Sequence, residues 1–327
     1  MRPRLLGTLL FAMTSGLVAC GGSTDEDDGE VIAVIPKGTN HEFWKSIHAG
    51  ACKAASETDS SIEWMGPEKE DDREAQKTMV ENFISAGAKG IVLAPMDDRA
   101  LVSVCEEAVE EGIPVVIIDS GLDWDGYVSF VASDNYAGGV KAAEHLGLLL
   151  EGEGDVILLR YQVGSASTTR REEGFLDAMR DKFPQVKLLD TDQRAGATTG
   201  SAQDKAEALL QIFKEEVDGI FCPNESTVHG MLRALEDAGM AGQVRFVGFD
   251  ATDMLAEALR DGKIDGLILQ DPFAMGEKGV QAILDHQAGK TVPKRIDTGV
   301  YLATPENMDE PNIQRLLHPD LDRWLGD

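Results

Sequence analysis

Basic residues are scarce in this sequence, and their scarcity excludes one class of partner. The 327 residues include 30 Lys and Arg against 58 Asp and Glu, which gives a formal net charge of −28. A protein that binds nucleic acid needs a basic face for the phosphates, and the Lys and Arg residues here do not cluster into one. We therefore expect no nucleic-acid partner.

Cysteines are also few, and their positions fit neither a disulfide framework nor a zinc site. The four lie at positions 20, 52, 105 and 222, without a C-x-x-C pair or a Cys/His spacing suited to zinc. Cys20 belongs to an N-terminal motif described below. Three cysteines remain, and this odd number argues against a disulfide framework. Cys52 and Cys105 fall in helical patterns and are expected to be small core residues. We expect neither a metal ion nor a cofactor.

Catalytic motifs are absent or incomplete. The sequence contains no G-x-S-x-G elbow and no G-x-G-x-x-G fingerprint. The run His41–Lys45 begins like a zinc-protease motif, but Lys45 stands where the second histidine must be. Gly289–Thr291 is similar to the end of a phosphate loop, but position 284 is Leu instead of Gly. We therefore expect this protein not to be an enzyme.

Long apolar runs are missing as well, apart from one short segment near the N-terminus. Arg2 and Arg4 precede the mostly apolar stretch Leu5–Val18, which is too short to span a bilayer. A positive start followed by a short apolar stretch is typical of a secretory signal. We assign residues 1–20 to this signal, so the rest of the protein is expected outside the cytoplasm, in the cell envelope.

The tetrad that ends at Cys20, Leu-Val-Ala-Cys, resembles a bacterial lipobox. The resemblance implies that Cys20 becomes the acylated N-terminus of a membrane-anchored lipoprotein. Residues 21–30 (GGSTDEDDGE) then form an acidic tether. An acidic surface repels anionic lipid headgroups, so acyl chains must supply the anchor. The alternative is an ordinary signal peptide that is cut nearby and leaves Cys20 unmodified.

The remaining chain alternates short Val/Ile-rich runs with segments of helical periodicity, and this alternation predicts parallel sheets. At about 300 residues it is too large for one compact core, and two domains are expected. The expected strands lie at residues 31–36, 61–65, 90–94 and 114–119, and after Ser133 at 155–160, 187–192, 219–222, 245–249 and 266–270. The fold class is therefore α/β, with two doubly wound parallel-sheet lobes.

Polar residues follow these strands, where ligands bind in open parallel sheets. The positions concerned are Lys37, Asp97, Asp119, Ser133, Asp134, Asn224, Asp250 and Gln270. Carboxylate, amide and guanidinium groups bind adjacent hydroxyls, and aromatic faces such as those of Phe43 and Trp44 pack on sugar rings. Each position has a structural alternative, since Asp and Asn also cap helices and Phe43 fits a core stripe.

The chain from residue 31 to about residue 305 resembles the periplasmic substrate-binding proteins of the ribose/galactose type, which serve sugar importers driven by ATP. The resemblance rests on VIAVIPKGTNHEFW from Val31, IPVVIID from Ile113, VASDNYAGG from Val131, REEGF from Arg171, IFCPNE from Ile220, VGFD from Val247 and LQDP from Leu269. It implies two lobes joined by a three-segment hinge near residues 133–135, 267–270 and 298–300. The N-terminal lobe would comprise residues 31–133 and 271–298, and the C-terminal lobe residues 134–270 and 299–327.

The resemblance also implies roles for individual side chains. Sugar hydroxyls would be bound by Asp119, Arg171, Asn224, Asp250 and Gln270, with Ser133 at the lobe junction, and the sugar ring would lie between Phe43 and Trp44. Where ribose binders of the family have Asn and Arg, this chain has Ala94 and Ser120, and it places Lys37 and His41 on the first loop instead. We therefore expect a ligand other than ribose. The alternative for Lys37 is a solvated residue at the rim of the cleft.

The resemblance implies a binding protein that captures a monosaccharide or polyol and delivers it to ABC permease subunits. A sensory receptor that presents the closed lobes to a membrane kinase or chemoreceptor is the alternative function, because it uses the same cleft. A monomer is expected. Cytoplasmic repressors with this core carry an N-terminal pair of DNA-binding helices. This sequence has a signal and a tether in that place, which argues against a repressor. Residues 306–327 are assigned only a packing or capping role.

Overall fold

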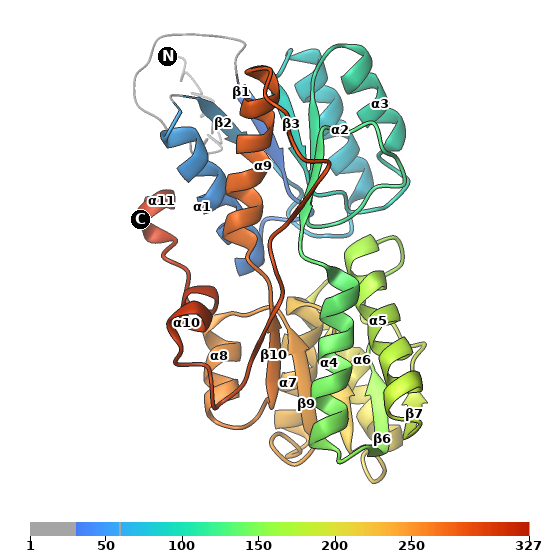
Figure 1. Cartoon of the computed structure of the whole chain (residues 1–327). Coiled ribbons are helices and arrows are strands. Elements are labelled where there is room, and N and C mark those ends of the chain that lie inside the picture. Colours follow the sequence, from blue (N-terminus) through green and yellow to red (C-terminus); the bar gives the residue numbers. More distant parts are fainter. Residues whose placement is uncertain (1–30, 59, 327) are drawn as a thin grey trace, which may run out of the picture.

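The computed structural model describes residues 31–58 and 60–326, and it has two α/β lobes, one above the other in Figure 1. Within this described part, each lobe is built on one six-stranded sheet with helices on both faces. The fold class expected from the alternation of strands and helices is thereby confirmed. The signal, the tether and Cys20 lie outside the described residues. Among the residues described, no helix is both long and apolar enough to cross a bilayer.

The sheet of the first lobe is parallel throughout, in the order β11-β5-β4-β3-β1-β2. Its strands are β1 (Val31–Ile35), β2 (Ser61–Trp64), β3 (Gly90–Leu93), β4 (Val115–Ile118), β5 (Ser129–Ala132) and β11 (Arg295–Asp297). Its helices are α1 (Glu42–Ser56), α2 (Arg73–Ser85), α3 (Val102–Glu110) and α9 (Pro272–Gln287). Alternate residues of β1 pack into two different apolar clusters, one on each face, as expected of a strand that is covered on both sides.

The second lobe repeats this arrangement in the order β12-β10-β9-β8-β6-β7. Its strands are β6 (Glu153–Leu158), β7 (Gln185–Asp190), β8 (Gly219–Phe221), β9 (Arg245–Phe249), β10 (Gly266–Leu269) and β12 (Tyr301–Ala303), and β12 alone of these runs antiparallel to its neighbour. Its helices are α4 (Asn135–Leu149), α5 (Ala166–Lys182), α6 (Thr199–Phe213), α7 (Glu225–Asp237) and α8 (Asp253–Arg260).

The helix α4 was not expected from the sequence. Its residues NYAGGVKAAEHLGLL combine small and apolar side chains around most of the helix, so no clear amphipathic period appears. The helix is largely buried because it lies between α5 and the second sheet. The short strands β5, β11 and β12 were also missed.

Glycines allow one helix pair in each lobe to pack at very short range. A Cβ atom at Gly139 of α4 would lie 1.9 Å from the carbonyl oxygen of Arg171 in α5. In the first lobe, a Cβ atom at Gly50 of α1 would lie 1.9 Å from the carbonyl oxygen of Phe273 in α9. Both distances are far inside van der Waals contact, so a residue with a side chain requires the backbones to separate. The close packing at each glycine therefore fixes the position of a helix whose N-terminus faces the other lobe.

The chain passes between the lobes where β5 leads to α4, where β10 leads to α9 and where β11 leads to β12 (Figure 1). Ser133, after β5, ties the first of these segments to the third. Its hydroxyl donates to the carbonyl oxygen of Gly299 at 2.7 Å and lies 3.3 Å from the hydroxyl of Thr298. Arg295 also donates to the carbonyl oxygen of Ser133, at 3.0 Å. Neighbouring crossings are therefore held together by hydrogen bonds.

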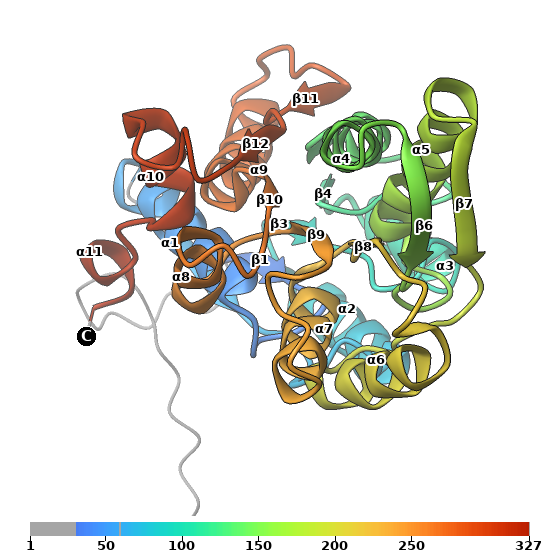
Figure 2. The same cartoon turned by 90° about the horizontal axis from the view of Figure 1, so that it is seen from below.

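The C-terminal residues 304–326, which we name the strap, contact both lobes. The helix α10 (Pro311–Leu317) packs Ile313, Leu316 and Leu317 into the core of the second lobe. The helix α11 (Asp322–Leu325) instead lies beside α1, and Trp324 and Leu325 pack against the core of the first lobe (Figures 1 and 2). Assigning the whole of residues 299–327 to the second lobe is therefore wrong for α11, because its apolar side chains find their contacts in the first lobe.

Candidate functional site

The carboxyl ends of the two sheets face each other across an interlobe cleft. The structure brings together every residue that the sequence placed in the site, except Ser133: Lys37, His41, Phe43, Trp44, Asp119, Arg171, Asn224, Asp250 and Gln270. Most of them lie in loops after strands or in the first turns of helices, as the geometry of parallel sheets requires. The cleft wall also contains residues that the sequence did not single out, among them Glu70, Tyr161, Ser165, Ser167, Thr168 and Glu225.

Ser133 is the exception, and its placement in the ligand site was wrong. It directly follows β5, where the chain crosses to the other lobe. Its hydroxyl therefore forms hydrogen bonds to another crossing segment, at Thr298 and Gly299, instead of lining the cleft. Asp97 and Asp134, also noted after strands, serve local structure. Asp97 accepts from the backbone N–H groups of Arg99 and Ala100, and Asp134 caps α4 by accepting from Ala137 at 3.0 Å.

Arg171 lies at the centre of the cleft, on α5, and only 2% of it is exposed. Its Nη atoms lie 3.9 Å from Asp119 of the first lobe and 3.8 Å from Asp250 of the second. Its Nε donates to the side chain of Asn135 at 2.7 Å, and its guanidinium lies 3.9 Å above the ring of Phe249. These contacts hold the guanidinium plane in one orientation between two carboxylates, one from each lobe.

Asp119 and Asp250 occupy equivalent positions, each directly after the fourth strand of its lobe's βα series. Their φ angles are 58° and 73°, in the left-handed region that few residues other than glycine adopt. Such backbone strain is typical of functional sites, where the surrounding structure compensates for it. Burial raises the pKa of Asp250, although the Arg171 guanidinium and a hydrogen bond from Gln270 act in the opposite direction.

Lys37 reaches into the cleft, which contradicts its alternative placement as a solvated rim residue. It is 3% exposed, and its ammonium group lies 2.9 Å from the carboxylate of Asp119. The same group donates to the hydroxyls of Ser167 at 3.1 Å and Ser165 at 3.4 Å, both at the start of α5. Lys37 therefore joins a carboxylate of its own lobe to the opposite lobe, because the buried charge needs these partners.

Glu70 is the centre of a buried hydrogen-bond network on one wall of the cleft. Its carboxylate accepts from the indole of Trp44 at 2.7 Å and from the hydroxyl of Tyr161, in the other lobe, at 2.7 Å. Its distance to Nδ1 of His41 is 2.6 Å. Glu70 was missed because the polar run around it, GPEKEDD, has the composition of a solvated loop.

The pair formed by His41 and Glu70 is ionised in this environment. Burial lowers the pKa of His41, but the carboxylates of Glu70, Glu225 and Asp250 together outweigh burial and raise it to about 9. Burial likewise raises the pKa of Glu70, but the charge and hydrogen bond of His41 outweigh it and lower the pKa to about 2. The network therefore contributes one buried cation and one buried anion to the wall of the cleft.

Glu225 crosses from the second lobe to the beginning of α1. Its carboxylate accepts from the backbone N–H groups of Phe43 at 3.1 Å and Glu42 at 3.4 Å, which have no partner within the helix. Burial raises the pKa of Glu225 to about 7, against the opposing effect of His41. Asn224, just before it, lines the cleft and also forms the N-cap of α7.

Gln270 has an unused hydrogen-bonding group. Its amide nitrogen donates to Asp250 at 2.7 Å, while its Oε1 is buried and has no hydrogen-bond partner among the described residues. A buried acceptor without a partner costs free energy unless a ligand or water supplies a donor. Oε1 of Gln270 is therefore placed to accept from a hydroxyl or ammonium group in the cleft.

The lobes are closed upon each other in this structure. The central cavity measures ≈ 20 Å³, enough for about one water molecule. Besides the contacts above, Arg73 donates to the carbonyl oxygen of Val163 at 2.7 Å, and the backbone of Asp98 donates to that of Gly164 at 2.9 Å. Two larger hollows adjoin the cavity. One of ≈ 400 Å³ shares His41, Trp44, Glu70 and Glu225 with it, and one of ≈ 490 Å³ lies beside the strap.

The polar groups of the cleft are suited to a polyhydroxylated molecule. Carboxylates and amides offer several donors and acceptors. Phe43 and Trp44, however, lie edge to face with ring centroids 4.9 Å apart, so the expected placement of the sugar ring between them does not fit this structure. Within the part of the chain that the structure describes, no group of three or more His, Cys, Asp and Glu residues is placed to hold a metal ion.

Comparisons with known proteins agree with this geometry. The periplasmic binding protein domain matches residues 32–291. The D-allose-binding periplasmic protein of Escherichia coli (strain K12) is 29% identical over 270 residues, which cover 80% of this chain and 86% of that protein. A ribose import binding protein of Bacillus subtilis (strain 168) is 27% identical over 267 residues, 81% of this chain and 84% of that protein.

Solved structures show the same arrangement of lobes. A carbohydrate transporter solute-binding protein of Agrobacterium radiobacter, in complex with D-arabinose, has a TM-score of 0.85 and 30% identity and covers 89% of this chain and 100% of its own. An ABC transporter solute-binding protein of Agrobacterium vitis with bound D-fucose has a TM-score of 0.84 and 34% identity, covering 88% and 100%. The chain therefore belongs to the periplasmic binding protein family, among the substrate-binding proteins of the ribose/galactose type that serve sugar ABC importers.

Proposed function

We propose that this protein captures a sugar or sugar-like polyol in the interlobe cleft and delivers it to the permease of an ABC importer. The observation that carries the proposal is Arg171, held between a carboxylate of each lobe, in a cleft also lined by Gln270, whose oxygen has no partner among the described residues. This set of groups binds hydroxyls on several sides of a ring. The names of the relatives, which include binders of D-allose, D-arabinose, D-fucose and xylitol, support the ligand class.

Capture requires the lobes to separate and close again about the crossing segments, which we take as the hinge. A ligand bonded to Asp119 of one lobe and Arg171 of the other favours the closed state by its differential contacts. No chemical step is involved, so the ligand leaves unaltered. We expect the protein to act as a monomer, since each lobe supplies half of the site.

The ligand class is tested by thermal unfolding in the presence of pentoses, hexoses, polyols and sugar acids. A ligand that binds only the folded protein stabilises it by about 2.7 kcal/mol at a hundredfold excess over Kd. We expect a concentration-dependent rise in Tm with at least one sugar or polyol and a smaller rise with ribose. Recovery of the ligand unchanged after long incubation separates binding from catalysis. A flat Tm across all four classes contradicts the proposal.

We propose further that an acylated Cys20 anchors the protein on the outer side of a membrane. The short apolar segment, the Leu-Val-Ala-Cys tetrad and the acidic tether after it support this. Each buried methylene of an acyl chain adds roughly 0.8 kcal/mol of membrane affinity. Cys20→Ser should abolish labelling by radioactive fatty acid, whereas Ser15→Ala in the same segment should leave it intact. Equal labelling of the two variants would show that Cys20 is not the attachment site.

The alternative, a receptor that reports the sugar to a membrane kinase or chemoreceptor, uses the same closed lobes. The importer is favoured because the solved relatives are described as transporter proteins. Deleting the gene should reduce uptake of the labelled sugar. Normal uptake with loss of a sugar-induced response would favour the receptor.

A further inference from the structure

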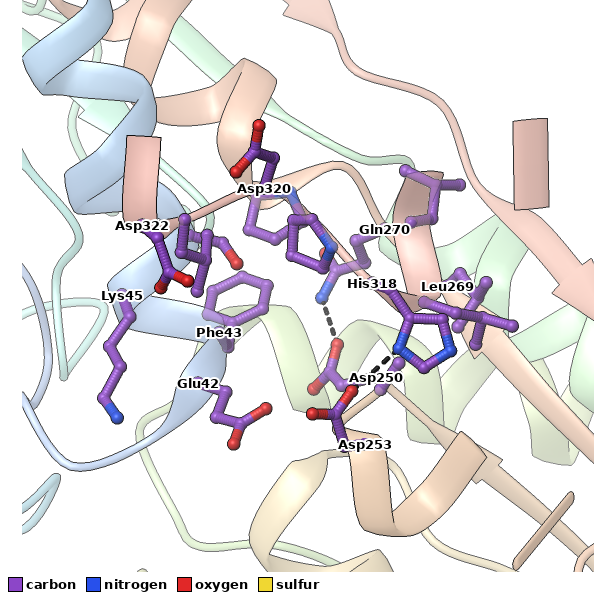
Figure 3. A pocket seen from close by; sticks show the side chains of 17 residues that line it. Glu42, Phe43, Lys45, Asp250, Asp253, Leu269, Gln270, His318, Asp320 and Asp322 are labelled. Atoms are coloured by element: carbon purple, nitrogen blue, oxygen red, sulfur yellow. Dashed lines mark hydrogen bonds and ion pairs between the residues drawn. The ribbon is translucent and has the colours of Figure 1, made fainter. Parts of the chain in front are cut away.

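The hollow beside the strap is a feature that the sugar cleft leaves unused (Figure 3). It measures ≈ 490 Å³, within the range of roughly 300–1,000 Å³ in which small-molecule sites fall. It shares Phe43, Asp250 and Gln270 with the cleft, so the two spaces adjoin at these side chains. A ligand ring held by Asp250 and Gln270 therefore has this space next to it.

The strap forms the outer wall of the hollow and is fixed at both of its ends. Toward the second lobe, Nδ1 of His318 lies 2.7 Å from Asp253, and Arg315 pairs at 2.8 Å with Asp271, where the chain crosses from β10 to α9. In the first lobe, the ring centroid of Trp324 lies 6.4 Å from that of Phe273. The segment His318–Asp322 between these anchors lines the hollow. Because the wall is attached to both lobes, it is part of the closed form and not a loose tail.

The lining combines apolar and acidic side chains. Leu317, Pro319 and Leu321 of the strap offer aliphatic surface, on which the C–H face of a ring can pack. The charged groups are mostly carboxylates, including Glu42, Asp253, Asp320 and Asp322, against Lys45 and the paired His318 (Figure 3). Carboxylates accept from hydroxyl and ammonium groups and repel acid groups.

Gln270 supplies an independent indication of a ligand at the junction of the two spaces. Its side chain is 3% exposed, its Oε1 has no partner among the described residues, and it lines both the cleft and the hollow. A ligand that extends from the cleft into the hollow therefore passes the Oε1 atom of Gln270.

We propose that the hollow is a second sugar subsite, so that the ligand is a neutral or amino disaccharide with one ring in the cleft and the other beneath the strap. The inference rests on the proposed function, which it deepens by naming the size and charge of the ligand. Sugar acids are excluded from this subsite by the carboxylates in its lining.

The test is calorimetry on the full mature chain with matched pairs of ligands: xylose with xylobiose, arabinose with arabinobiose, glucose with cellobiose, and galactose with galactobiose. At least one disaccharide should bind about tenfold or more tightly than its own monosaccharide. Leu321→Trp, which fills the hollow from the strap, should remove this gain and leave the affinity for the monosaccharide unchanged. Pro319→Trp repeats the test at a second strap position, and Leu148→Trp, on an exposed part of α4, is the control for an added indole.

Three results separate the possibilities. If monosaccharides bind and no disaccharide binds more tightly, the subsite is overturned and the proposed function stands. If both strap variants weaken the two members of a pair equally, the hollow is not a separate subsite, and the inference is again overturned. If no sugar of either size binds, the proposed function and the subsite fall together.

Discussion

The two lobes share one architecture but supply different chemistry to the cleft. The sheet orders correspond strand for strand, and Asp119 and Asp250 follow equivalent strands with the same left-handed backbone. The first lobe adds aromatic rings and the cation of Lys37, whereas the second adds the guanidinium of Arg171 and two amides. The scaffold therefore determines where functional groups stand, and the residues after each strand determine what those groups can bind.

Charged groups on each wall of the cleft have partners on the other lobe. The Asp119 carboxylate of the first lobe is paired with Lys37, but both also face Arg171 or the serines of the second lobe. Glu70 and Glu225 each accept hydrogen bonds from the opposite lobe. Since buried charges are costly without partners, the closed form depends on contacts that join unlike walls.

The largest effect is expected from removing the residue that links the two walls. Arg171→Ala leaves Asp119 and Asp250 buried without their shared cation, and breaking a buried ion pair costs about 3–5 kcal/mol. Sugar binding should fall below detection by calorimetry, and Tm should decrease. Arg171→Lys, the matched control, keeps the charge but loses the planar fork, and should retain weak binding. Near-normal affinity of the alanine variant would mean that Arg171 does not contact the ligand.

A second test compares the close helix crossings of the two lobes. Gly139→Ala and Gly50→Ala each place a methyl group against a backbone carbonyl, and overpacking of this kind costs about 1–3 kcal/mol. Both should lower the free energy of unfolding in urea, and Gly139→Ala should also weaken sugar binding because the carbonyl concerned is that of Arg171. Gly200→Ala, where no atom lies within 4 Å, is the control and should be neutral or slightly stabilising. Equal stability of all three variants would refute the packing argument.

The sequence predicted the strand ends well because parallel sheets place their carboxyl ends at one edge. That rule brought Lys37, Asp119 and Asp250 into the site. It failed at Ser133, since the rule does not distinguish strands that end in the cleft from those that end at a crossing. It could not find Glu70 or Tyr161, whose functions depend on a hydrogen bond between residues far apart in the chain. The position of α11 was likewise not predictable, because its contacts lie in the other lobe from those of α10.

A smaller effect is expected from the cation that is particular to the first wall. Lys37→Met removes the cation that lies closest to Asp119 and leaves that carboxylate with its weaker contact to Arg171. We expect the order of preference among sugars to change, with individual affinities shifting by about tenfold. Lys205→Met, at an exposed position of α6, is the control. The same ligand order in wild type and Lys37→Met, measured by calorimetry, would show that Lys37 does not set specificity.

The smallest effect is a dependence of closure on pH through Glu225. Closing buries this carboxyl and raises its pKa from 4.5 to about 7, so the closed form retains a proton that an open, solvated Glu225 releases. Binding should therefore be strongest below pH 4.5 and weaken as the pH rises to about 7, by at most about tenfold per pH unit for one proton.

Glu225→Gln isolates this contribution. The amide oxygen still accepts from the start of α1 but does not titrate, so the loss of affinity between pH 4.5 and 7 should become shallower. Identical pH profiles of the variant and the wild type would remove Glu225 from the account.

The central claim, that two unlike walls close on a sugar, is tested most directly by small-angle X-ray scattering of the wild-type protein. An open empty protein and a closed complex differ in the separation of the lobes, so the radius of gyration should decrease when the sugar identified by thermal unfolding is added. A sugar that does not raise Tm should leave the radius unchanged. A radius that stays the same with the bound sugar would contradict closure of the two lobes.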